Sequence, residues 1–171
     1  MTRSAAARGD WWDVLRGRQR AAAAAEDPGP PTPLTRSRIT RYLDSHEFSY
    51  AIDDDGDPTG SWEGNLFWFL CLGRAGEILQ VRGRWDRTLP LAQRSAARLV
   101  LNDWNRDRIW PKVYSRVEDD ELAVYAEVSA DLEAGADDAQ LRQLLDCGLS
   151  TCLQFFAQLD LAVPRSPDAP D

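Results

Sequence analysis

The sequence predicts an α+β fold in which helices pack on an antiparallel sheet of about five strands, in the order α-β-β-β-α-β-β-α. Two observations support this prediction. Two pairs of strand-like segments are each joined by a short turn, which makes the strands of each pair antiparallel. Three segments with apolar residues at intervals of three and four precede, separate and follow these pairs, and this spacing is typical of helices that bury one side.

The chain divides into an extension, a folded domain and a tail. Residues 1–31 combine a short predicted helix over Trp11–Ala25 with a linker rich in proline and glycine. The folded domain is expected over residues 32–163, and residues 164–171 are expected to form a disordered, solvated tail. Trp11 and Trp12 could anchor a docking peptide, but a frayed extension is the simpler interpretation and the one preferred here.

The first half of the domain is expected to supply one helix and three strands. Thr32 is a candidate N-cap with Pro33 in the first turn, and this helix should end near His46. A strand over residues 48–52 and an acidic loop over residues 53–60 follow. The next strand, residues 66–72, is continuously apolar and flanked by glycines, as in a strand buried on both faces. A turn at residues 73–76 leads into a return strand that ends at Trp85.

The second half is expected to supply a helix, a hairpin and a long final helix. Residues 113–128 alternate in polarity on both sides of Asp119-Asp120, which predicts a two-strand hairpin. Asp137 or Asp138 should cap the last helix. The middle helix is expected to begin with Pro90 in its first turn and Thr88 as its cap. Its apolar stripe is Leu89, Ala92, Ala96, Leu99, Val100 and Trp104.

Composition restricts the classes of partner. The 28 acidic and 20 basic side chains give a formal net charge of −8, which disfavours nucleic acid and anionic membrane surfaces as partners. No stretch of about 20 apolar residues predicts a membrane span, and no apolar leader follows Met1. Three cysteines without paired spacing are typical of reduced core thiols. We therefore expect a cytoplasmic protein.

The sequence contains no complete catalytic set. Asp53, Asp55 and Asp57 alternate as in a calcium-binding loop, but Pro58 and Gly64 occupy the positions where that loop needs glycine and glutamate. His46 is the only histidine, and at a helix end it is better explained as a capping residue than as a catalytic base. We expect no catalytic residue, no cofactor and no metal site.

Tryptophan and arginine side chains provide the candidate interaction surface. Trp85, Trp104 and Trp110 lie at the ends of predicted elements, where indole rings are often half-exposed and contribute strongly to binding. Arg82 and Arg84 project from one face of the same predicted strand. Asn105 is expected to cap its own helix.

Five short segments, in their order along residues 33–160, give the chain a resemblance to a known family. They are Tyr50–Asp57, Phe67–Leu72, Leu79–Trp85, the corner of Asn102–Asn105 with Pro111–Val113, and the acidic hairpin before Ala126-Glu127. In these segments the chain resembles the YbjN family of small bacterial proteins, also called bacterial sensory transduction regulators. The resemblance implies the α-β-β-β-α-β-β-α fold of type III secretion chaperones, which is often dimeric, and it brings no assigned catalytic residues.

Two functions are compatible with these observations. The preferred hypothesis is a non-enzymatic, cytoplasmic protein-binding module with a regulatory or chaperone-like role, which acts as a homodimer. The middle helix or the C-terminal helix would supply the dimer surface. The alternative is a domain that binds an anionic metabolite, or an enzyme, through the acidic loop of residues 53–57 together with Arg82 and Arg84.

Overall fold

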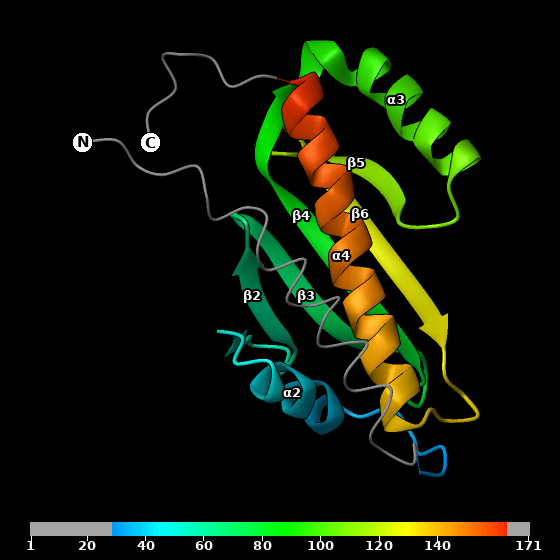
Figure 1. Ribbon diagram of the computed structural model, residues 1–171. Helices are drawn as coiled ribbons and strands as arrows, with labels where there is room; N and C mark the ends of the chain where they lie inside the picture. The colour runs from blue at the N-terminus through cyan, green and yellow to red at the C-terminus, as the bar shows by residue number, and fades with distance from the viewer. Residues whose placement is uncertain (1–28, 164–171) are drawn as a thin grey trace.

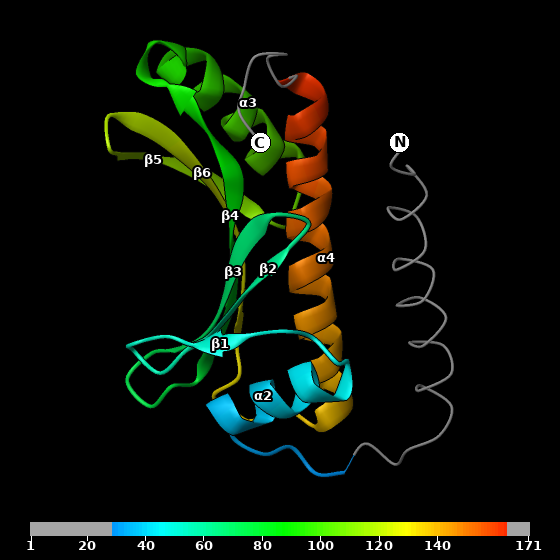
Figure 2. The same ribbon diagram turned by 90° about the vertical axis from the view of Figure 1, so that its left-hand side faces the viewer.

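The computed structural model describes residues 29–163 and contains a six-stranded antiparallel sheet with three α-helices packed on one face (Figures 1 and 2). The predicted helix over Trp11–Ala25 and the tail of residues 164–171 lie outside the described residues. The strands follow the order β1-β2-β3-β4-β6-β5 across the sheet. The predicted α+β class and antiparallel pairing are confirmed, with one strand more than the expected five.

The described elements are connected mostly by short turns. In chain order they are α2 (Arg36–Ser45), β1 (Ala51–Ile52), β2 (Pro58–Trp62), β3 (Asn65–Leu72), β4 (Ile78–Pro90), a 3₁₀ turn η2 (Leu91–Gln93), α3 (Arg94–Asp107), β5 (Lys112–Glu118), β6 (Glu121–Asp131) and α4 (Asp138–Ala162).

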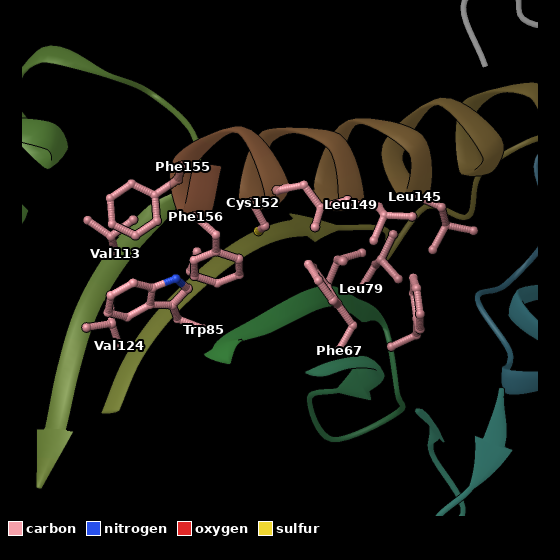
Figure 3. Packing of buried hydrophobic residues seen from close by; sticks show 14 of the residues in the cluster. Phe67, Leu79, Trp85, Val113, Val124, Leu145, Leu149, Cys152, Phe155 and Phe156 are labelled. Carbon is pink, nitrogen blue, oxygen red and sulfur yellow. The ribbon is translucent and has the colours of Figure 1, made fainter. Parts of the chain in front are cut away.

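Helix α4 is the main cover of the sheet. Its start is fixed by a capping box in which the Asp137 carboxylate accepts the Gln140 backbone N–H and the Gln140 side chain accepts the Asp137 backbone N–H. Figure 3 shows apolar side chains of α4 pointing into those of β3, β4 and β6. The helix lies close to the sheet because Gly148 has no side chain, and a Cβ atom there would lie 2.7 Å from that of Val81.

Strand β4 extends beyond Trp85, where the sequence predicted its end, because it remains paired with β6. The two strands pair from Ile78 to Arg84, shift register, and pair again from Thr88 to Pro90. Pro90 is therefore the last residue of a strand, not a residue of a first helical turn, and Thr88 is not a helix cap. Leu89 is buried in the core from this strand position. The prediction failed because long-range pairing with β6 outweighs a local helix-start signal.

Three predictions near the start of the domain were also wrong. Thr35, not Thr32, caps α2 with its side chain, and Thr32 instead pairs with Ala136 through two backbone hydrogen bonds. The first strand is limited to Ala51–Ile52, and the expected loop ends early because β2 begins at Pro58. Strand β2 was not predicted from the sequence, and it brings the number of strands in the sheet to six.

Helix α3 turns a different side toward the core from the one expected. Leu101 is its only buried residue, and Ala97 and Trp104 pack beside it as partly buried residues. Leu99 and Val100, which belong to the predicted apolar stripe, are 68% and 54% exposed. The predicted stripe therefore mixes residues that face the core with residues that face solvent.

Replacing Gly148 by alanine tests the close approach of α4 to the sheet. An alanine inside a helix ordinarily stabilises it by about 1 kcal/mol over glycine. Here the added methyl group would overlap Val81, so we expect Gly148→Ala to lower the free energy of unfolding by about 1–3 kcal/mol in urea titrations. The control is Gln154→Ala, an exposed position of the same helix, which should change it by less than about 0.5 kcal/mol. Stabilisation by Gly148→Ala would contradict the packing described.

Candidate functional site

The face of the sheet opposite the helices is the candidate functional site. No described helix covers this face, as Figure 2 shows. Alternation along β4, β5 and β6 directs arginine, tyrosine and glutamate side chains onto it, whereas the other face of the same strands carries the core. The result is a layer of polar and aromatic side chains. Two carboxylates in this layer each accept hydrogen bonds from several neighbouring side chains, and we call each carboxylate with its donors a centre.

Glu127 is the first of these centres. Its carboxylate accepts hydrogen bonds from Lys112 Nζ and from the Tyr114 hydroxyl, both at 2.9 Å. Arg82 Nε lies 3.5 Å from the same carboxylate, and the Arg82 guanidinium also donates to the Gln80 side chain. Glu127 is only 7% exposed, so its charge depends on these donors for stabilisation.

Glu118 is the second centre. It accepts hydrogen bonds from the Tyr125 hydroxyl at 2.5 Å and from Arg84 Nε at 3.1 Å. These donors lower the pKa of the Glu118 carboxyl, the Tyr125 hydrogen bond most strongly. Burial and the neighbouring Glu118 carboxylate raise the pKa of Tyr125. Arg84 is thus committed to a structural ion pair.

Tyr114 and Tyr125 join the two centres. Their rings stack with centroids 5.4 Å apart. Burial, with the charge of Glu127, raises the pKa of Tyr114 to about 12. The Arg116 guanidinium lies 5.3 Å from the Tyr114 ring centroid and 5.4 Å from that of Tyr125, within the range of cation–π attraction. Arg116 has no carboxylate within ion-pair distance among residues 29–163, so its charge faces solvent.

An open pocket lies on this face, and we call it the sheet pocket. Strands β3, β4 and β6 provide its floor, the acidic loop between β1 and β2 borders it from one edge of the sheet, and Arg116 reaches it from β5 at the opposite edge. Carboxylates and guanidinium groups therefore line the same depression. Its lining residues are Asp53, Asp55, Asp57, Trp68, Leu70, Arg82, Arg116 and Tyr125.

The acidic loop is held in shape by its own hydrogen bonds. One oxygen of Asp53 accepts the backbone N–H groups of Asp55 and Asp57, at 3.1 and 2.8 Å. The carboxylate of Asp57 accepts a hydrogen bond from Arg36 Nε at 2.7 Å, which ties the loop to the start of α2. Among the described residues, no group of three histidine, cysteine or acidic side chains is arranged to hold a metal ion.

The predicted interaction residues do not form one surface. Trp85 is fully buried, and its indole N–H donates to Asp160 at 3.2 Å, so its assignment to a surface was wrong. Trp104 is half-buried against Phe155, whereas Trp110 is 40% exposed. Arg82 lines the sheet pocket and Arg84 does not.

Asn105 has a different role from the one predicted. Its side-chain amide exchanges two hydrogen bonds with the backbone of Val113, at 2.8 and 2.9 Å. It therefore fixes the end of α3 to the edge strand β5 instead of capping its own helix, whose C-cap is Arg108.

The thiols and the histidine do not approach a catalytic arrangement. Burial raises the pKa of the Cys152 thiol strongly, which keeps it protonated. His46 caps α2, with Nδ1 2.9 Å from the Tyr42 carbonyl and its ring stacked beside Phe48. In the part of the chain that the structure describes, no helix is both long and apolar enough to cross a bilayer.

Sequence reasoning missed Trp68, Arg116 and Tyr125 as lining residues of the pocket. The alternation along each strand already placed Arg116 beside Tyr114 on one face, and Arg82 beside Arg84 on another. It could not show that these faces are the same side of one sheet. That depends on the pairing of β4 and β5 with β6, which aligns Arg82 with Glu127 and Lys112.

Comparisons relate the chain to a family and to solved structures. The family model described as "Putative bacterial sensory transduction regulator", YbjN, matches residues 35–161. The crystal structure of YbjN from E. coli, titled "a putative transcription regulator", is similar with a TM-score of 0.66 and 10% identity, covering 78% of this chain and 96% of that one. A chain from the HopA1-SchA chaperone-effector complex is similar with a TM-score of 0.48 and 15% identity, covering 74% and 97%. No curated protein matches the chain.

Removing the charge of Glu127 tests the first centre. Glu127→Gln keeps the side-chain size but leaves Arg82 and Lys112 without their carboxylate, so we expect the free energy of unfolding to fall by about 2 kcal/mol in urea titrations. The matched control is Glu133→Gln at an exposed position, with an expected change below about 0.5 kcal/mol. Equal effects of the two changes would show that the centre does not contribute to stability.

Removing the Tyr125 hydroxyl tests the second centre. A carboxyl whose pKa is lowered by folding contributes stability above its ordinary pKa and loses that contribution as the pH falls through its folded pKa. Tyr125→Phe should raise the pKa of Glu118 in carboxyl NMR titrations. Its destabilisation should accordingly be larger at pH 7 than at about pH 3. Tyr50→Phe, whose hydroxyl bonds Asp44 instead, should leave the pKa of Glu118 unchanged.

Proposed function

The chain belongs to the YbjN family, and from this premise we propose that it is a non-enzymatic protein-binding module with a regulatory or chaperone-like role. The family description and the absence of a catalytic arrangement among residues 29–163 support this proposal. Its first partner is a second copy of the chain. The net charge of −8 disfavours nucleic acid as a partner, and three free thiols suit the reducing cytoplasm.

The observation that carries the proposal is the exposed apolar side of α3. Ala96, Leu99 and Val100 lie at helical spacing on a side that no other described element covers, and we call them the α3 surface. A 14-residue helix with a single buried residue gains little from packing within its own chain. A partner that covers the α3 surface would supply the missing packing.

The neighbouring strand adds a second contact element. Strand β5 is the edge of the sheet and pairs with β6 alone among the described strands. The Asn105 side chain occupies the outer backbone groups of Val113, which leaves those further along β5 to pair with another strand. Val117, on the side of β5 that faces the helices, is 49% exposed. A two-fold symmetric dimer brings the same surface of both copies together. Burying Leu99 and Val100 would then contribute about 1.5–3 kcal/mol per side chain before the entropic cost of association.

The metabolite-binding alternative has less support. Arg84 is paired with Glu118, and Arg82 is shared between Glu127 and Gln80, so neither guanidinium is reserved for an anionic ligand. The sheet pocket is also open, whereas sites for small molecules usually enclose most of their ligand.

A leucine-to-aspartate change at the α3 surface tests the proposal. Light scattering on the full chain should give twice the chain mass for the parent protein and the mass of one chain for Leu99→Asp, because the new carboxylate would be buried without a partner. The matched control is Leu161→Asp, at a leucine of α4 that is 83% exposed, and it should remain dimeric. A monomeric parent protein, or a dimeric Leu99→Asp variant, would contradict the proposed surface.

A further inference from the structure

We propose that residues 10–20 of the same chain dock in the sheet pocket. Arg16, Arg18 and Arg20 would lie against the acidic loop, and Asp10 and Asp13 toward Arg116. This inference concerns the opposite face of the sheet from the α3 surface and does not rest on the proposed function.

The charged side chains of the pocket that form no ion pair among residues 29–163 set the first requirement for an occupant. Asp55 is exposed, and one oxygen of Asp53 has no hydrogen bond within the described residues. Arg116 is stacked on two tyrosines and forms no ion pair with residues 29–163. A matching occupant therefore carries basic groups for the loop and acidic groups for Arg116.

Residues 10–20 meet this requirement. They carry two aspartates followed by three arginines, in a chain whose formal net charge is −8. Trp11 and Trp12, between the aspartates, suit the apolar part of the pocket floor, which Trp68 and Leu70 form. Indole rings bury large areas against such surfaces and are frequent at contact sites.

The order of the charges also agrees with the path of the chain. The described chain begins at Gly29, pairs with Ala136 through Thr32, and reaches the acidic loop at Arg36, the first residue of α2, which donates to Asp57. The arginines are nearer to Arg36 in sequence than the aspartates, just as the loop is nearer to Arg36 in the fold than Arg116 on the far edge strand. The two charge patterns therefore run in the same order.

The length of chain is sufficient for this contact. Arg20 precedes Gly29, the first described residue, by nine positions, which can span up to about 30 Å when extended. A domain of this size has a radius of gyration near 14 Å. Since the contact is largely ionic and exposed, raising the salt concentration should release it.

Photo-crosslinking of the full-length protein tests the assignment. The photoreactive residue benzoylphenylalanine replaces Trp12, and the crosslinked peptides are mapped by mass spectrometry. The expected result is an intramolecular crosslink to residues 53–70 or 112–125, which falls about tenfold at 1 M salt. The same fall is expected in the Arg16→Gln, Arg18→Gln, Arg20→Gln variant, whose substitutions lie outside the described residues.

A matched pair of variants isolates the acidic loop. Asp53→Asn with Asp55→Asn removes two charges but keeps the side-chain oxygen that accepts the loop's backbone N–H groups, and it should reduce the crosslink about tenfold. Asp119→Asn with Asp120→Asn removes two charges at the exposed turn between β5 and β6 and should leave the yield unchanged. Crosslinks that map elsewhere, that join two copies of the chain, or that are equal in both double variants would overturn the proposal.

Discussion

The contact between α4 and the sheet is the constraint on which the rest of the structure depends. The apolar side chains of α4 fill the face formed by β3, β4 and β6, and Phe156 contacts Phe67 there with ring centroids 6.1 Å apart. Gly83 makes room for both rings, because a Cβ atom at that position would lie 2.8 Å from each. With α2 and α3 on the same side, one face of the sheet receives nearly all of the core (Figure 3).

This one-sided core explains the chemistry of the opposite face. A sheet face without a helical cover must still protect its backbone and remain compatible with water. The long arginine stems and tyrosine rings cover the strands while their polar ends reach solvent or a carboxylate. Glu118 and Glu127 each accept hydrogen bonds from side chains on neighbouring strands. Their negative charges are therefore balanced by donors on β4, β5 and β6. Arg116 and the acidic loop lie outside these two centres, and the sheet pocket lies between them.

Local signals predicted the elements that local interactions determine. The hairpin turn at Asp119-Asp120 and the cap at Asp137 are as expected, because a two-residue turn and a capping box depend on adjacent residues. The start of α3 and the burial of Trp85 were not predictable in this way. The start of α3 depends on the pairing of β4 with β6, a strand more than 30 positions away in the sequence. The burial of Trp85 depends on the position of α4. The pocket combines residues from four strands and a loop, and only the register of the sheet brings them together.

Strand β5 contributes to both proposed surfaces, and its geometry allows both to be occupied. Val117 points to the side of α3 and Arg116 to the side of the pocket, since neighbouring side chains alternate across a strand. The outer backbone groups of β5 beyond Val113 lie in the plane of the sheet, between these two sides. A second copy that paired with this edge and covered the α3 surface would therefore leave the Arg116 side chain in place. Docking of residues 10–20 and dimerisation thus use different groups of the same strand, and neither requires the other to be absent.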